Sequence, residues 1–328
     1  MTERVLITGA SGFLGFHLIE AALKKGLEVY ASVRKSSDIR HLQHFKIKYT
    51  CLDFDDISDM KNEIESNKYQ YIIHAAGTTK AKSQHEYNKT NANFTYNLGK
   101  ATELAYTNVK RFVFVSSLAA IGPLQDYDNI LTEESTPRPV TFYGKSKLLG
   151  EEKLSAMTLP LTIIRPTAIY GPREKDMLQM FKSISKGWEP YIGKRPQQLS
   201  FVYVKDAANV IVNALFSNTT QTVYNISDGG FYDRYELANL AKLILKKKTK
   251  RVHLSERAVI VLAATLEKAY EVFHLVPLIN REKLNELTAA NWTCSIEKAS
   301  HDLELKPAYN LEYGLRETLD WYKTNHWI

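Results

Sequence analysis

The sequence begins with a stretch that decides its fold: Arg4-Val5-Leu6-Ile7-Thr8-Gly9-Ala10-Ser11-Gly12-Phe13-Leu14-Gly15. The apolar run before the first glycine predicts a buried strand, and the segment between the last glycine and Gly26 has a helical pattern. Three glycines spaced three apart permit a tight turn, a close backbone approach to a ligand, and close packing of the helix on the strand. Because a helix start offers free N–H groups to phosphate, we interpret the stretch as a pyrophosphate cradle for a dinucleotide. A tight turn without a ligand is the plainer alternative.

The composition is that of an ordinary globular protein, with 44% hydrophobic and 24% charged residues among 328. The net charge of +7 is explained by phosphate-bearing small ligands, and no basic arm of the nucleic-acid type is visible. The basic run Lys246–Arg251 follows a helical pattern, so we interpret it as favourable charge at a helix end. The two cysteines stand far apart, which favours a reducing, cytoplasmic setting. We expect a small-molecule substrate, no nucleic acid, no membrane span and no metal site.

Strands and helices alternate through the first half of the chain. We expect strands at 27–33, 46–52, 71–74, 111–115 and 161–165, and helices at 57–67, from Asn91 to about Tyr106, and from Tyr143 to about Met157. This alternation predicts an α/β fold, a Rossmann doubly wound parallel sheet with a smaller, mostly helical C-terminal substrate lobe. Residues 1–165 should form the NAD(P)-binding Rossmann domain, with a later strand returning near 201–226, and 166–328 should form mainly the lobe.

Other segments are less regular. Residues 78–89 are polar and read as an irregular substrate loop, and a strand at 201–204 precedes a helix to about Leu215. We expect the last strand at 224–226. The apolar segment Glu256–Phe273 is interpreted as a packed helix of the lobe, with a membrane-surface helix as the alternative.

The end of the second expected strand indicates the cofactor. An enzyme that uses NAD usually places an acid there, bonded to the ribose 2′-hydroxyl. This chain has Ser32 and Val33 followed by Arg34 and Lys35, so cations stand where a 2′-phosphate would lie. The pattern favours NADP(H), with NAD(H) or a merely solvated loop as alternatives. Asp53, after the third strand, could accept from the adenine amino group or cap the next helix.

Tyr143 and Lys147 are four residues apart on an expected helix and therefore share a face. A lysine charge lowers the pKa of a neighbouring phenol, which is ordinarily about 10. The tyrosine can then exchange a proton with a carbonyl or hydroxyl oxygen while a hydride moves to or from nicotinamide. Ser117 can hold the substrate oxygen, and Asn91 can hold a water that relays protons to Lys147. The plainer alternative is an exposed aromatic residue and an ordinary helix lysine.

Six segments together resemble the extended short-chain dehydrogenase/reductase family, also called the NAD-dependent epimerase/dehydratase family: Thr8–Gly15, His74–Ala76, Val113–Ser117, Tyr143–Lys147, Arg165–Pro172 and Phe201–Asp206. The resemblance covers nearly the whole chain. It implies Ser117 as the catalytic hydroxyl, Tyr143 as the acid/base and Lys147 as its partner. Ser117 is preferred to its neighbour Ser116 because it lies five residues before Gly122, as in the family, although Ile121 replaces the family's tyrosine. The resemblance also leaves room for a homodimer.

The resemblance narrows the reaction. Dehydratases of the family place an Asp-Glu pair beside the catalytic hydroxyl, whereas Leu118 and Ala119 follow Ser117 here. Val33 and Arg34 look like the dihydroflavonol-reductase-like branch, and the C-terminal pattern is similar to the 3β-hydroxysteroid-dehydrogenase-like branch. We therefore expect an NADP(H)-dependent oxidoreductase of a fairly apolar ketone or alcohol. The alternatives are a nucleotide-sugar epimerase with tightly bound NAD, whose diphosphate the basic loop 193–195 could hold, and a non-catalytic cofactor-binding regulator.

The candidate residues fall into two sets. The catalytic candidates are Ser117, Tyr143, Lys147 and Asn91. The cofactor-binding candidates stand in the glycine turn, after the strands and on the catalytic helix: Gly9, Ser11, Gly12, Phe13, Leu14, Gly15, Arg34, Asp53, Phe54, Ala75, Ala76, Gly77, Tyr143, Lys147, Pro166 and Ile169.

Overall fold

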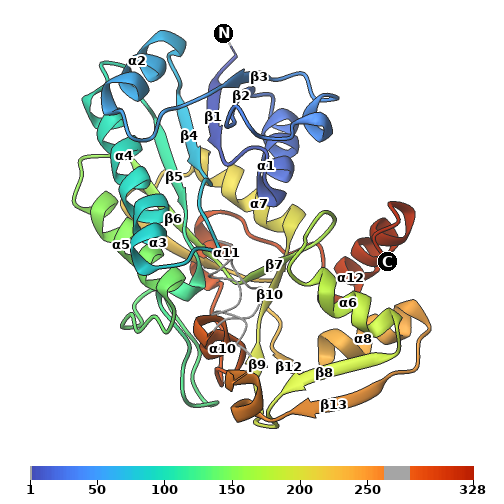
Figure 1. Cartoon of the computed structure of the whole chain (residues 1–328). Helices are drawn as coiled ribbons and strands as arrows, with labels where there is room; N and C mark the ends of the chain where they lie inside the picture. The colour runs from blue at the N-terminus through green and yellow to red at the C-terminus, as the bar shows by residue number, and fades with distance from the viewer. Residues whose placement is uncertain (1, 262–280) are drawn as a thin grey trace.

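A computed structural model describes residues 2–261 and 281–328 (Figure 1). Seven parallel strands form its large sheet in the order β11-β6-β5-β4-β1-β2-β3. The strands are β1 (Arg4–Thr8), β2 (Glu28–Ser32), β3 (Lys48–Thr50), β4 (Tyr71–His74), β5 (Arg111–Val115), β6 (Leu161–Pro166) and β11 (Thr222–Ile226). The strand order reverses between β1 and β4, so the predicted doubly wound Rossmann sheet is confirmed.

Helices cover both faces of this sheet (Figure 1). One face packs on α1 (Phe13–Lys24), α7 (Val204–Asn213) and α11 (Glu297–Asp302). The other packs on α2 (Ile57–Asn67), α4 (Phe94–Leu104) and α5 (Phe142–Ser155). Because both faces are covered, the central strands β4, β5 and β6 are buried along their whole length, which explains their continuous apolar runs.

A smaller lobe packs beside the ends of these strands. Its strands form three two-stranded sheets: β7 (Ala168–Tyr170) with β10 (Phe201–Tyr203), β8 (Trp188–Ile192) with β13 (Lys250–Leu254), and β9 (Gln198–Leu199) with β12 (Tyr232–Asp233). Its helices include α6 (Leu178–Ser185), α8 (Glu236–Leu245), α10 (Arg281–Leu287) and α12 (Leu311–Thr324). A separate apolar core holds the lobe together, with Phe181, Leu237 and Leu315 among its buried members.

The region before α4 differs from the sequence-based expectation. Residues 78–89 are not irregular throughout, because α3 (Gln84–Asn88) lies within them, and the Ser83 side chain caps it by accepting from the Glu86 N–H. Asn91 does not open a helix either. It lies in a widened turn, Lys89–Asn93, that joins α3 to α4 without a break. Helix propensity does not reveal such a turn, because the turn differs from an ordinary helix only in which backbone groups are hydrogen-bonded to each other.

Three strand predictions also needed correction. The third strand pairs only over Lys48–Thr50, and the strand at 201–203 pairs with β7 in the lobe, whereas β11 joins the large sheet. The strand at 224–226 is not the last, since β12 and β13 follow it. Short 3-10 turns occupy Arg40–Leu42, Leu118–Ala120 and Ala214–Phe216.

The expected helix at Glu256–Phe273 falls largely outside the described residues, and only 256–261 of it are seen as helical. Within the described part of the chain, every helix is too short or too polar to cross a membrane.

Candidate active site

The glycine turn leaves the start of α1 open. Gly9 has a φ of +69°, and a Cβ there would lie 2.6 Å from the Ala75 carbonyl oxygen, so the turn presses against the chain after β4. A Cβ at Gly15 would collide with the Gly9 carbonyl oxygen. Gly12 precedes α1 and offers no side-chain cap, so the first N–H groups of the helix stay available to an anion. These features fit a pyrophosphate.

The other turn candidates lie around this opening. Phe13 and Leu14 form the first turn of α1, and the Ser11 hydroxyl is 3.4 Å from that of Ser37, in the loop after β2. Thr8 accepts the Ala76 N–H at 3.1 Å and bonds the buried His74 ring at 2.7 Å. Burial lowers the pKa of His74 to about 3, so the ring is neutral and serves as a fixed spacer between β1 and α4.

A cavity lies at the carboxyl ends of β2 and β3. It has a volume of about 310 Å³ and is lined by Val33, Arg34, Lys35, Ser37, Ile39, Tyr49, Thr50 and Cys51. The lining holds two cations and no acid, and Arg34 and Lys35 are both exposed. This chemistry suits a phosphate ester better than a ribose hydroxyl, because a hydroxyl is usually read by a carboxylate acceptor.

Asp53 and Phe54 lie at the end of β3. Asp53 is exposed and accepts from the Asp55 N–H at 3.0 Å. It does not cap α2, because Asp56 does so by accepting from two N–H groups, and that alternative is therefore wrong. Phe54 is half-buried and stacks on Phe94 at a ring distance of 5.5 Å.

Ala75, Ala76 and Gly77 connect the cofactor turn to the catalytic candidates. A Cβ at Gly77 would lie 3.0 Å from the Asn91 Oδ1 and 3.2 Å from the Lys147 Nζ, so this backbone passes between the two side chains. Further along the same sheet edge, Pro166 ends β6 and the half-buried Ile169 lies in β7. The carboxyl ends of β1, β4, β5 and β6 thus meet at one edge, where ligands bind in such sheets.

Ser117 and Tyr143 are brought into contact. Ser117 caps the 3-10 turn after β5, and Thr141 caps α5 by accepting the Gly144 N–H at 3.0 Å, which fixes Tyr143 in the first turn. The Ser117 hydroxyl lies close enough to the phenol of Tyr143 to lower its pKa. Burial nevertheless raises the pKa of Tyr143 to about 12, so the phenol is protonated.

Lys147 is buried one helical turn beyond Tyr143. Its Nζ donates to the Val115 carbonyl at 2.9 Å and lies 4.9 Å from the centre of the Phe114 ring. Burial lowers the pKa of Lys147 to about 8, partly offset by the charge of Glu151. Burial of the phenol outweighs every other influence on the pKa of Tyr143 in this arrangement, and the Lys147 ammonium bonds a backbone carbonyl, so its effect on the phenolate stays a prediction.

Asn91 is held by three hydrogen bonds, and the water relay expected of it stays a prediction. Its amide bonds the Thr78 N–H at 2.8 Å, the Thr78 carbonyl at 2.9 Å and the Ser146 hydroxyl at 2.9 Å. These bonds tie the loop after β4 to α5 and occupy both ends of the amide. In this arrangement Asn91 positions Gly77 and α5. A water molecule would bind either the second lone pair of the Asn91 Oδ1 or an amide that has given up one of these bonds.

Sequence reasoning missed a buried ionic cluster behind these residues. Glu151 accepts from Arg165 at 2.6 Å, and it also accepts from the Ser116 hydroxyl. Ser116 therefore faces α5, whereas its neighbour Ser117 faces Tyr143. The sequence places Glu151 four residues after Lys147 on the same helix face, but it carries no sign that Arg165 pairs with Glu151.

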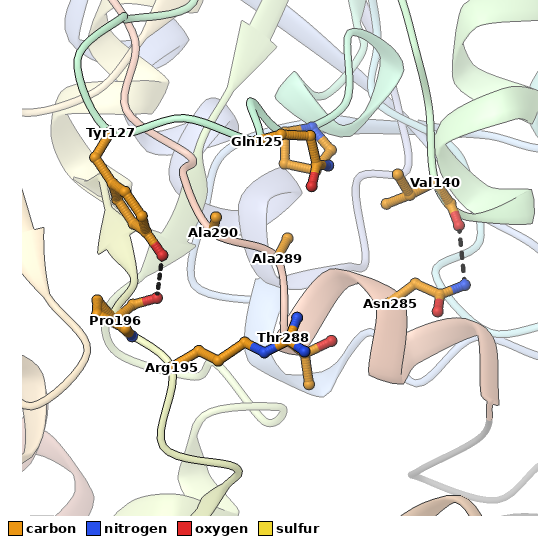
Figure 2. Close-up of a pocket in the computed structure, with 10 residues that line it drawn as sticks. Gln125, Tyr127, Val140, Arg195, Pro196, Asn285, Thr288, Ala289 and Ala290 are labelled. Atoms are coloured by element: carbon orange, nitrogen blue, oxygen red, sulfur yellow. Dashed lines mark hydrogen bonds between the residues drawn. The ribbon is translucent and has the colours of Figure 1, made fainter.

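A large cavity lies between the loops after β5 and before α5 and two segments of the lobe (Figure 2). It has a volume of about 560 Å³ and is lined by Pro123, Gln125, Tyr127, Val140, Arg195, Pro196, Asn285, Thr288, Ala289 and Ala290. Tyr127 donates to the Pro196 carbonyl at 3.0 Å, and Asn285 donates to the Val140 carbonyl at 3.3 Å, so three distant segments close around the space. Arg195 is the single charged residue in this lining.

Two further observations concern metal ligands and the arginines near the large cavity. Within residues 2–261 and 281–328, no cluster of His, Cys, Asp and Glu could hold a metal ion. Arg234, beside the basic loop, is already engaged, since its guanidinium donates to the Ile192 and Arg195 carbonyls. Arg195 is highly exposed, and its nearest acid, Glu256, is 3.9 Å away.

Comparison with known proteins identifies the family. A family model described as the NAD dependent epimerase/dehydratase family matches residues 5–227. Ceramide reductase of Caulobacter vibrioides is 24% identical, over 99% of this chain and 96% of its own. The decarboxylating sterol-4-alpha-carboxylate 3-dehydrogenase of Candida albicans is 27% identical, over 97% of both chains. UDP-glucose 4-epimerase of Vibrio cholerae is 26% identical, over 76% of this chain and 78% of its own.

A solved structure shows the same fold. The UDP-glucose 4-epimerase of Thermotoga maritima, solved with UDP-glucose, superposes with a TM-score of 0.79 at 20% identity, covering 98% of this chain and 99% of the other.

Proposed function

The chain belongs to the NAD-dependent epimerase/dehydratase family, and from that premise we propose that it is an NADP(H)-dependent oxidoreductase that interconverts a ketone and an alcohol on an apolar, lipid-like substrate. In this proposal residues 1–165 and the returning β11 bind the cofactor, and residues 166–328 mainly bind the substrate. We thus place the chain with the reductase and hydroxysteroid-dehydrogenase branches of the family in preference to its epimerases.

One observation carries the choice of reaction. The ceramide reductase and the sterol dehydrogenase align over at least 97% of this chain, the substrate lobe included, whereas the Vibrio epimerase aligns over 76%. The lobe is the part that selects substrate, so likeness there weighs more than likeness in the common sheet. Ceramides and sterols are lipids, so this likeness favours an apolar, lipid-like substrate. The large cavity mixes Pro, Val and Ala walls with the polar side chains of Gln125, Asn285 and Thr288, which can bind the polar groups of such a lipid.

The choice of NADP(H) is supported by the cavity at Arg34 and Lys35. A 2′-phosphate there would meet two cations, and Arg34 presents a planar donor set that matches phosphate geometry. No carboxylate in that lining would repel it. NAD(H) would leave both cations without a partner.

The proposed chemistry uses Tyr143 as the acid in the direction of reduction. The bound cofactor supplies or accepts the hydride. Tyr143, protonated because of its burial, donates a proton to the carbonyl oxygen, and the neighbouring Ser117 hydroxyl holds the same oxygen. As the phenolate forms, the Lys147 charge stabilises it and thereby lowers the barrier.

Lys147 also orders the site. Its bond to the Val115 carbonyl and its nearness to Gly77 place the ammonium between β5 and the loop after β4. We assign it the nicotinamide ribose as a further partner. Asn91 supports this position through Thr78 and Ser146.

The test begins with the purified protein. Any dinucleotide released on denaturation is identified, and the emptied protein is titrated with NADPH and NADH. We expect exchangeable binding with a clear preference for NADPH, and NADPH oxidation in the presence of long-chain or polycyclic ketones. Failure to bind either dinucleotide would remove the proposal entirely.

A nucleotide-sugar epimerase is the second candidate, and Arg195 at the large cavity is the observation that favours it, because a sugar diphosphate needs cations. Tightly retained NAD after purification, with NADPH unable to replace it, would favour this reaction. Interconversion of UDP-glucose and UDP-galactose without net oxidation would then be the assay.

A further inference from the structure

Two segments of the lobe concentrate the positive charge of the whole chain. Residues 182–195 and 242–254 together contain ten lysines and arginines and one acid, Glu189, although the full chain has a net charge of only +7. The remainder of the chain is therefore slightly acidic. Because β8 pairs with β13 and the Lys250 N–H donates to the Gly187 carbonyl at 2.9 Å, the two segments form one surface.

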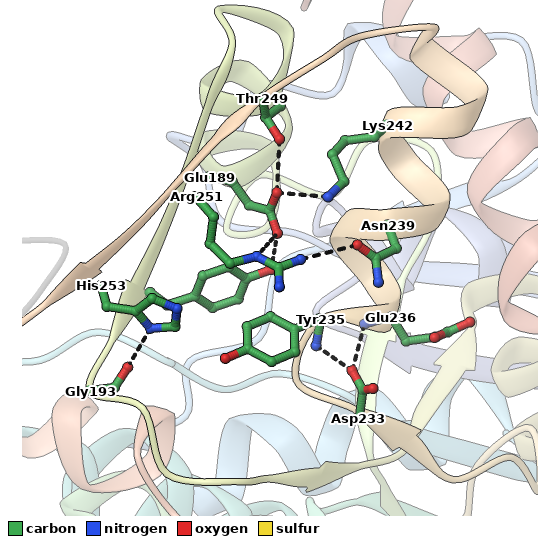
Figure 3. Close-up of polar contacts among 11 residues, drawn as sticks. Glu189, Gly193, Asp233, Tyr235, Glu236, Asn239, Lys242, Thr249, Arg251 and His253 are labelled. Atoms are coloured by element: carbon green, nitrogen blue, oxygen red, sulfur yellow. Dashed lines mark hydrogen bonds and ion pairs between the residues drawn. The ribbon is translucent and has the colours of Figure 1, made fainter.

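The single acid in these segments is not available to neutralise the surface. Figure 3 shows Glu189 under the β8–β13 sheet, where it is 2% exposed. Its carboxylate accepts from Lys242 at 2.7 Å, from Arg251 at 3.0 Å and from Thr249 at 2.8 Å. Glu189 thus anchors the sheet to α8 from the inner side.

Further cations lie at this same end of the sheet. Among the described residues, Lys186, Lys247, Lys248 and Lys250 pair with no acidic side chain, and all four are exposed. Lys246 ends α8 as the helix pattern predicted, but the run continues past the helix into β13. Favourable charge at a helix end explains the first lysine and leaves the others without a structural role.

Large apolar side chains are also exposed on this sheet and on α8. Residues paired across parallel strands point to the same side, so Trp188 and Lys250 share the outer face of the β8–β13 sheet. At the far end of this face Leu254 pairs with Ile192, which is partly buried against Val259 and Leu284. Trp188 is 51% exposed and Leu254 is 43% exposed, and Leu243 in the last turn of α8 is 73% exposed. Such residues add no stability to the lobe while they face water.

We propose that this outer face, with the lysines at its end, docks the protein on the surface of an anionic lipid membrane. Lysines are attracted to negative headgroups, and tryptophan lies favourably at the boundary between headgroups and acyl chains. A nucleic acid would satisfy the lysines but not Trp188 or Leu254 on a flat sheet face, so the lipid surface accounts for more of what is exposed.

The position of the face agrees with the large cavity. β8 leads directly into the loop that carries Arg195 and Pro196, which line that cavity. A protein docked through β8 and β13 would hold the cavity close to the bilayer. The docking inference itself rests on charge and exposure and stands whether or not the proposed reaction is correct.

Vesicle sedimentation tests the inference with the full-length protein. The wild-type chain should bind phosphatidylcholine vesicles that contain about one quarter phosphatidylglycerol, bind pure phosphatidylcholine weakly, and be released by high salt. The double variant Lys247→Glu with Lys248→Glu should lose at least about tenfold in vesicle affinity. Its matched control is Lys24→Glu with Lys25→Glu, an adjacent exposed pair at the end of α1, far from β8.

Tryptophan fluorescence supplies a second readout that does not depend on a charge variant folding. Vesicles should shift the emission of the wild-type protein to shorter wavelength, and Trp188→Phe should abolish that shift while the three other tryptophans remain. Absence of vesicle binding, equal weakening in the control pair, or a shift that survives in Trp188→Phe would overturn the inference. Binding of duplex DNA without binding of vesicles would overturn it as well.

Discussion

Tyr143 is the residue on which the proposed reaction depends most directly. Its phenol is the protonated group that contacts Ser117 at the sheet edge. Tyr143→Phe should therefore retain NADPH binding and lower kcat by about a hundredfold to ten-thousandfold, the usual range for loss of a general acid. Tyr106→Phe is the matched control, because Tyr106 is 93% exposed. NADPH oxidation and NADPH titration are measured together, and a variant with full activity would disprove the assigned role.

Glu151 and Lys147 predict a pH dependence whose sign follows from burial. The pKa of Lys147 is lowered to about 8, so its charge is present below that pH and lost above it. The pKa of Tyr143 is raised to about 12, so the phenol stays protonated over the same range. Hence kcat/KM for ketone reduction should fall as the pH rises through about 8.

Replacing Glu151 tests that assignment. The Glu151 charge raises the pKa of Lys147, so Glu151→Gln should move the alkaline fall of kcat/KM to lower pH. It should also destabilise the fold by about 3–5 kcal/mol, because Arg165 is left buried without its counter-charge. Glu152→Gln, an exposed neighbour on α5, is the control for both readouts. A folded Glu151→Gln enzyme with an unchanged pH profile would contradict the electrostatic link.

Arg34 decides cofactor choice in the proposal. Hydrogen bonds to charged groups contribute about 1.5–3 kcal/mol, so Arg34→Ala should weaken NADPH by about ten- to a hundredfold and leave NADH nearly unchanged. Arg40→Ala is the control, since Arg40 is exposed and already paired with Asp38. Dissociation constants for both cofactors are measured by fluorescence titration. Equal weakening of NADPH and NADH would remove the argument for a 2′-phosphate site.

The β1–α1 turn is the element that the sequence predicted most fully, and glycine geometry explains why. Gly15 has no room for a side chain, whereas Gly26, at the far end of α1 with a φ of +77°, has open space around it. Gly26→Ala should therefore lower the free energy of unfolding by only about 1–2 kcal/mol, the cost of holding an alanine in the left-handed backbone conformation. Gly15→Ala should cost about 1–3 kcal/mol from overpacking and, unlike Gly26→Ala, should also weaken NADPH binding. Urea unfolding and NADPH titration of both variants test this; undisturbed binding in Gly15→Ala would contradict the cradle.

Other elements could not be predicted from local pattern. Asn91 was expected at a helix start because the segment before it is polar, yet α3 and the widened turn place it inside a continuous helix. Likewise Glu151 and Arg165 were not identified, because their pairing depends on α5 lying over β6, which only the tertiary structure shows. Periodicity marks buried faces well, but it does not reveal which polar groups meet across them.

At the scale of the whole molecule, the alternation of strands and helices and the doubly wound parallel sheet followed from the sequence, whereas the strand pairing of the lobe did not. The large sheet is built from successive units of one strand and one helix, so recognising one unit in the sequence supports the assignment of the next. The lobe is built from short strands that pair across long gaps, such as β8 with β13, and pairs of that kind leave no signal in either segment alone. The large cavity is lined from three such distant segments, so its shape was beyond sequence reasoning.

The sheet and the lobe are nevertheless joined through Arg173. This guanidinium lies 4.2 Å from the ring of Phe16 in α1 and 5.4 Å from that of Trp321 in α12, and the His17 ring bonds the Pro172 carbonyl at 3.3 Å. The contacts connect the helix that opens the cofactor cradle to the C-terminal helix of the lobe. We therefore expect the two parts to unfold together.

Ligand-linked unfolding tests this coupling. All four tryptophans lie in the lobe, at 188, 292, 321 and 327, so their fluorescence reports the lobe, while circular dichroism reports the whole chain. NADPH at about a hundred times its dissociation constant should stabilise the native state by about 2.7 kcal/mol, and the same concentration of NADH should do less. If the parts are coupled, NADPH raises the midpoint of both signals equally, and Arg173→Ala separates them. If NADPH leaves the midpoint of the tryptophan signal unchanged in the wild-type protein, the lobe unfolds independently of the sheet. The contacts of Arg173 would then be too weak to couple the two parts.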